Sequence, residues 1–271
     1  MLRYVRARRD LVLYVQASMP CVSGVSFSER GENVMGQFLI LSGVIGAESN
    51  EVRNALSEYA RSCGGGLELA EGSTDDRNIG VITRGGLNTT VMYPQWFIEW
   101  DDASRVLSEK LGKPVFAFHI HDGDLWMFIL FRDGKEIGWF NTIPEYWEEL
   151  SAEEKEKWKG DASLIAEVIP SVSAEEIERY FVEWDLDDEE PAKAYPNDES
   201  TSCNCWQMCD FMKKIGIEYP IGDDGSIHGD TFQFWTEKFP LNKKAAAPPA
   251  ATPAPAATPA PAPRKHWWKL W

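Results

Sequence analysis

The clearest hydrophobic pattern in the chain lies between residues 115 and 140, where three apolar runs are separated by two Asp-Gly pairs. The runs are Val115–His121, Asp124–Arg132 and Lys135–Phe140. Asp-Gly favours a type I′ turn, because both central residues of that turn need positive φ, and such turns join antiparallel strands. The pattern therefore predicts a three-stranded antiparallel meander over residues 115–140.

The middle run of this meander is apolar at every position from Leu125 to Phe131. A strand without alternating polar residues is buried on both faces, so other elements must cover it on each side. We therefore predict that the meander lies at the centre of a sheet that has two covered faces.

The chain between residues 38 and 111 shows two helical patterns set among further strands. Apolar residues recur at helical spacing over Asn50–Cys63 and again between Ala103 and Leu111, and a glycine follows each pattern. Ser49 is a candidate cap for the first helix, and Asp101 or Asp102 for the second. Strands are predicted at residues 38–45, 67–70, 79–83 and 89–93.

These elements together predict an α+β fold: a mainly antiparallel sheet with two helices on one face, reminiscent of the ferredoxin-like plan. Residues 145–241 are expected to cover the other face as a helical C-terminal half. The expected helices are Tyr146–Trp158, Ser163–Ile169, Ala174–Trp184 and Cys205–Ile215, with Phe232–Phe239 as an aromatic closing segment.

Composition divides the chain into four parts. Residues 1–34 carry an Arg-rich start and lack the long apolar run of a signal peptide, so we expect a poorly ordered extension before Met35. Residues 35–241 are expected to form one α+β domain, with the sheet core in 35–144 and an acidic helical cover in 145–241. Residues 242–263 are expected to form an Ala/Pro linker, because 245–263 contain only Ala, Pro and Thr. Residues 264–271 form a Trp-rich tail, and the linker and tail are expected to be disordered.

The charge of the chain is strongly acidic, with a formal net charge of −16 and a pI near 4.7. Such a chain is repelled by nucleic acid and by anionic lipid, so basic proteins or cations are its expected partners. Between Glu145 and Glu190 there are seventeen Asp and Glu against four Lys and Arg, a local net charge of −13. The densest run consists of Asp185, Asp187, Asp188, Glu189 and Glu190. We predict that this run contacts a basic protein, by fast electrostatically steered association.

The tail combines aromatic and basic residues. Trp267, Trp268 and Trp271 stand among Arg264, Lys265 and Lys269. Trp is enriched in binding hot spots, so the tail is predicted to be a docking motif. Its candidate targets are a membrane surface, a groove on a partner, and the acidic face of its own domain.

A second hypothesis concerns metal binding. His119 and His121 alternate along one predicted strand, so both rings project from one face, and Asp122 and Asp124 follow at the turn. This arrangement can hold a divalent metal, and a hydrolase site would need further ligands. A second cluster could complete it, namely Asp223, Asp224, His228 and Asp230.

The five cysteines are too few and too unevenly placed for a disulfide framework. Cys203, Cys205 and Cys209 crowd together, which allows either a metal or redox role or small core residues on one helix face. A reducing cytoplasm is the simpler location. No apolar run reaches the length of a membrane-spanning helix.

These observations predict a non-enzymatic acidic interaction protein. It is expected to resemble an immunity protein or inhibitor in its action on a basic protein partner, to need no cofactor, and to use the tethered Trp motif as a second contact. The alternative is a metal-dependent enzyme that uses His119 and His121 with Asp122 or Asp124.

Overall fold

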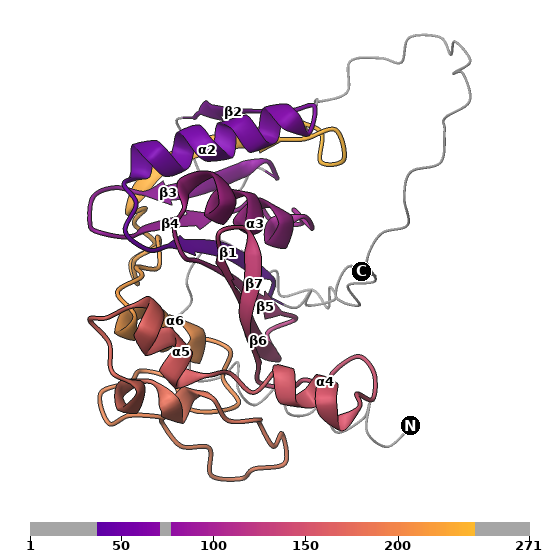
Figure 1. Cartoon of the computed structure of the whole chain (residues 1–271), viewed down its shortest axis with the longest axis vertical. Helices are drawn as coiled ribbons and strands as arrows, with labels where there is room; N and C mark the ends of the chain where they lie inside the picture. The colour runs from indigo at the N-terminus through magenta and orange to yellow at the C-terminus, as the bar shows by residue number, and fades with distance from the viewer. Residues whose placement is uncertain (1–36, 71–76, 242–271) are drawn as a thin grey trace, which may run out of the picture.

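The computed structural model describes residues 37–70 and 77–241, and these form a sheet with elements packed on both faces (Figure 1). Within these residues the order along the chain is β1 Leu39–Val44, α2 Ser49–Ser62, β2 Gly66–Leu69, β3 Ile79–Thr83, β4 Thr89–Met92, α3 Trp100–Leu111, β5 Val115–His121, β6 Leu125–Arg132, β7 Lys135–Asn141, α4 Ala152–Lys157, α5 Ala162–Val168, the 3₁₀ helices η1 Ala174–Glu176 and η2 Glu178–Tyr180, α6 Gln207–Lys214 and β8 Gly229–Trp235. The expected N-terminal extension, the Ala/Pro linker and the Trp-rich tail lie outside the described residues.

The sheet has eight strands in the order β2-β8-β3-β4-β1-β5-β6-β7, and neighbouring strands are antiparallel. Since β4 and β5 both run antiparallel to β1, they are parallel to each other, and α3 joins them across β1. The mixed α+β class with a mainly antiparallel sheet is confirmed. The more specific ferredoxin-like resemblance stays a prediction.

The predicted meander is present as β5, β6 and β7. Both central residues of its two turns have positive φ: 55° and 77° for Asp122 and Gly123, and 51° and 70° for Asp133 and Gly134. The prediction that the meander is central is wrong, because β7 is an edge strand and β1 lies near the middle. The meander lies at one end because β1 pairs with β5 and every other strand adds beyond β1, and the expected closing segment Phe232–Phe239 contributes β8, which inserts between β2 and β3 at the opposite end.

The middle strand β6 is covered on both faces, as its composition predicts. Leu125, Met127, Ile129 and Phe131 face a core shared with α2 and α3. The alternate residues Trp126, Phe128 and Leu130 face a second core formed with α5 and α6. Figure 1 shows α2 and α3 side by side on the sheet, and α5 and α6 grouped away from them.

The second cover is less helical than predicted. The helix expected over Tyr146–Trp158 is limited to α4, where Ser151 and Glu154 form a capping box. The helix expected over Ala174–Trp184 is two short 3₁₀ helices, after which the chain extends so that the Trp184 amide donates to the Thr142 carbonyl at 2.7 Å. In both segments contacts with the end of the sheet override the local helical preference.

Candidate functional site

The two histidines of β5 lie on one face, as predicted, and touch each other. Nε2 of His119 and Nδ1 of His121 are 3.2 Å apart, so one imidazole donates a hydrogen bond to the other. His119 is 8% exposed and stacks on the indole of Trp100, with ring centroids 5.2 Å apart. The pair is therefore embedded beneath α3 at the point where β5 ends.

Burial sets the charge of both rings. It lowers the pKa of His119 to about 3, and the neighbouring His121 acts in the same direction. Burial also lowers the pKa of His121, although the charge of Asp124 opposes this shift. Both imidazoles are therefore neutral near pH 7.

Aromatic side chains that the sequence patterns did not single out surround His121. Its ring lies 4.9 Å from Phe38, 4.9 Å from Trp147 and 5.6 Å from Tyr146, measured between centroids. Phe38 in turn contacts Trp96, which is 44% exposed and has a φ of 70°. Positive φ is rare for a bulky residue and marks a position that its surroundings hold in place. We call these four residues around His121 the aromatic cluster; Tyr146 and Trp147 fall where a helix was expected, so helical spacing gave no signal for them.

The carboxylates at the β5–β6 turn differ in their surroundings. Asp122 is exposed, whereas Asp124 accepts a hydrogen bond of 2.6 Å from the Tyr146 hydroxyl through Oδ2. Across residues 37–70 and 77–241, no group of three or more His, Cys, Asp or Glu side chains is placed to hold a metal ion. The metal hypothesis based on His119, His121, Asp122 and Asp124 stays a prediction, which metal analysis of the purified chain would test.

The second acidic cluster cannot complete this site. β8 and β5 are separated by β3, β4 and β1, so their residues lie four strand spacings apart, roughly 19 Å. His228 instead contacts Glu218 at 3.0 Å, and Asp230 forms an ion pair with Arg84. The expectation that Asp223, Asp224, His228 and Asp230 could join the histidine pair is therefore wrong.

Of the three clustered cysteines, Cys205 is buried, whereas Cys203 and Cys209 are half-buried. Cys205 is buried in the second core, and Cys203 donates a hydrogen bond from Sγ to the Asp185 carbonyl at 3.2 Å. Burial raises the pKa of Cys205 to about 12 and also raises the pKa of Cys203 and Cys209. Because the thiolate is the nucleophile and the metal ligand, these shifts disfavour both roles.

The acidic run 185–190 forms an anchored surface loop. Its five carboxylates are exposed, and within the described part of the chain none of them forms an ion pair with Lys, Arg or His. The loop folds on itself: Asp185 Oδ1 accepts from the Asp187 amide, and Asp188 Oδ1 from the Glu190 amide, each at 3.0 Å. Trp184, which is 6% exposed, anchors the start of the loop in the second core.

Several contacts place the acidic loop at the same end of the sheet as the histidines. Trp184 binds the backbone of Thr142, and Thr142 in turn bonds the backbone of Trp126 at the start of β6. Lys155 bridges Glu145 and Glu183, with distances of 2.7 and 3.0 Å. We call this region the acidic end; it comprises the β5–β6 turn, the aromatic cluster, Glu145, Glu183 and residues 185–190.

Comparison of the chain with protein-family models, with curated proteins and with solved structures gives no match. None of the helices in the described residues has the length and apolar character required to cross a membrane.

Proposed function

We propose that the chain is a non-enzymatic interaction protein whose acidic end binds a basic protein, in the manner of an inhibitor or immunity protein. The observation that carries the proposal is the loop 185–190: five exposed carboxylates, held by the loop's own hydrogen bonds, with no cationic partner in the described chain. A surface fixed in this way attracts a cationic partner at long range.

The aromatic cluster supplies the apolar contact that charge alone does not provide. Trp96 is exposed and contacts the half-buried Phe38, and the half-buried Tyr146 and Trp147 lie against His121. Binding hot spots are enriched in such aromatic side chains, and polar and charged groups surround them at the rim of an interface. Neutral His119 and His121 add no positive charge that would repel a basic partner.

A direct test uses a lysine homopolymer of about twenty residues as the probe and isothermal titration calorimetry as the readout. In the first variant, Asp185, Asp187 and Asp188 become Asn, and Glu189 and Glu190 become Gln. The matched control neutralises five exposed carboxylates elsewhere, so the change in net charge is identical: Glu68, Asp133, Glu218, Asp223 and Glu237.

We expect the loop variant to lose at least about tenfold in affinity, the control to change by less than about twofold, and binding to weaken steeply with salt. Equal losses in the two variants would show that only net charge matters, and would contradict a binding surface at the acidic end.

We also propose that residues 264–271 form a second contact, with Trp267, Trp268 and Trp271 as its anchors. A Trp side chain buries a large area for few rotatable bonds, and the linker composition favours a semi-rigid tether. A membrane surface, a groove on a partner and the acidic face of its own domain are the alternatives for its target.

A further inference from the structure

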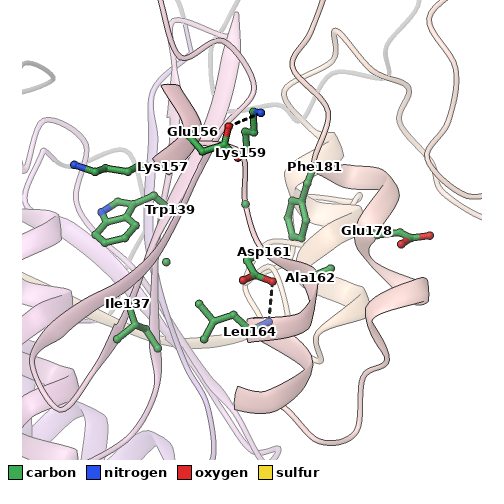
Figure 2. Close-up of a pocket in the computed structure, with 12 residues that line it drawn as sticks. Ile137, Trp139, Glu156, Lys157, Lys159, Asp161, Ala162, Leu164, Glu178 and Phe181 are labelled. Carbon is green, nitrogen blue, oxygen red and sulfur yellow. Dashed lines mark hydrogen bonds and ion pairs between the residues drawn. The ribbon is translucent and has the colours of Figure 1, made fainter. Parts of the chain in front are cut away.

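The sheet carries an open trough at its β7 edge, away from the histidine pair (Figure 2). Its volume is about 580 Å³, within the range of ligand pockets. Three half-buried apolar side chains on the α5 face of the sheet line it, namely Ile137, Leu164 and Phe181. Trp139 also lines it at the edge, but its side chain packs against the core beneath α2 and α3. In Figure 2 Leu164 extends from α5 towards Ile137, whereas the Trp139 indole points away from Phe181, on the other side of its strand.

The backbone at this trough is an incompletely paired sheet edge. The described chain pairs the outer side of β7 around Phe140, where the Asn141 amide donates to the Trp158 carbonyl and the Gly160 amide to the Trp139 carbonyl, both at 3.0 Å. Gly160, with a φ of 76°, then turns the chain away into α5. Residues 135–138 are left as a free edge of the kind that accepts an added strand.

A β-bulge marks the same place. The register between β6 and β7 shifts at Leu130 and Phe131, so that Ile137 has no partner on β6. Bulges terminate regular pairing and redirect side chains, and they are common next to functional sites. Here the bulge lies where the trough opens.

The rim of the trough carries charges of both signs. Glu156 and Lys159 neutralise each other in an ion pair of 2.5 Å, and the Asp161 side chain caps α5. Lys157 and Glu178 are exposed and form no ion pair within the described residues. The trough is therefore a small apolar floor of Ile137, Leu164 and Phe181 with a rim of mixed charge, which suits an aromatic side chain flanked by polar and charged groups.

We propose that residues 264–271 of the same chain bind in this trough, with one or more of Trp267, Trp268 and Trp271 against its apolar floor. This inference rests on the proposal that the segment is a docking motif, and it names the target. Trp binding requires apolar area to be buried, and the trough offers half-buried apolar side chains beside an unpaired strand edge.

The connecting segment is long enough for this contact. Residues 242–263 span about 70 Å as a polyproline-type chain, at ~3.1 Å per residue. A domain of the described size is about 45 Å across, so the tether reaches the trough from Leu241 wherever it runs.

Limited trypsin digestion of the full chain, followed by intact mass, tests the proposal because the segment contains its own cleavage sites. Cleavage at Arg264, Lys265 and Lys269 reports on docking, and cleavage at Lys243 and Lys244 is the internal control. Each rate is divided by the rate at the same site in an isolated peptide of residues 242–271. With an effective concentration near 1 mM and a dissociation constant near 0.1 mM, we expect about tenfold protection of the three distal sites and little at Lys243 and Lys244.

Variants locate the docking surface. Ile137→Glu and Leu164→Asp should each abolish the protection, whereas Val182→Asp should retain it, because Val182 is an exposed apolar residue (54%) that does not line the trough. Replacing Trp267, Trp268 and Trp271 with Ala should also abolish protection without changing the folded domain, which keeps the test valid if a trough variant unfolds.

Four results would overturn the proposal: no protection in the unmodified chain, protection that persists in both trough variants, protection that rises with protein concentration, or protection only with anionic vesicles present. In the same order, these results would indicate that the segment does not dock, docks at another face of the domain, docks on a second copy of the chain, or binds a membrane. None of them bears on the titration of the acidic loop, so the two proposals fail separately.

Discussion

At the residue scale, burial rather than residue type determines the chemistry of the histidine pair. The two-residue periodicity of a strand places both rings on one face, and this could be predicted from the sequence. Their burial could not, because Trp100 comes from α3 and Tyr146 and Trp147 come from a segment after the meander. These non-local neighbours lower the pKa of both rings and keep them neutral.

The lowered pKa of His119 predicts a pH-dependent stability. Between pH 6.5 and about 3 the unfolded chain binds a proton at His119 that the folded chain does not, so the free energy of unfolding falls as pH falls through this window. From pH 7.5 to pH 5 the loss should be about 2 kcal/mol for this group, at ~1.4 kcal/mol per pH unit below 6.5.

Urea unfolding at several pH values checks the slope. His119→Gln removes the titrating group and should flatten the slope by about one proton. A slope that His119→Gln does not alter would show that the ring is not buried in neutral form.

At the element scale, strands marked by turn residues or by a continuous apolar run can be predicted from the sequence. The Asp-Gly turns and the doubly apolar β6 lie close to their expected bounds. Phe232 and Phe234 alternate with Gln233, but no local pattern identifies β8, because its neighbours β2 and β3 lie far away in the sequence. The acidic loop and the histidine pair were predicted separately, and their placement at one end depends on contacts such as Trp184 with Thr142, which no local pattern encodes.

The join between β2 and β8 gives an element-scale prediction. A Cβ at Gly65 would overlap the carbonyl oxygen of Trp235, so Gly65→Ala must force the two strands apart. We expect a loss of about 3 kcal/mol in the free energy of unfolding, because overpacking against backbone has little room to relax. Amide hydrogen exchange in residues 66–69 should accelerate as well.

Gly85→Ala is the matched control for strained backbone. Gly85 has a φ of 76° with open space around it, so only the left-handed conformation opposes a side chain, at roughly 1 kcal/mol. A smaller effect at Gly65 than at Gly85 would contradict the close approach of β2 to β8.

At the scale of the whole molecule, the last described strand closes the structure. β8 fills the space between β2 and β3, and Phe232 and Phe234 are fully buried in the core beneath α2 and α3. The sheet core therefore draws on residues after 144. Because residues before and after 144 share one sheet, we expect them to unfold together.

Two truncations test this dependence on β8. A chain that ends at residue 228 loses β8, leaves β2 and β3 with unpaired edges and uncovers Phe97 and Tyr93, whose rings contact Phe234. We expect no cooperative unfolding transition from it, and association through the exposed edges in size-exclusion chromatography.

A chain that ends at residue 241 keeps every described element. It should lose about 1.4 kcal/mol at most, the stabilisation that a tenfold intramolecular docking equilibrium of the tail contributes. A native-like urea transition from the chain ending at 228 would show that β8 is an accessory strand. A loss above about 3 kcal/mol in the chain ending at 241 would make residues 242–271 part of the folded core.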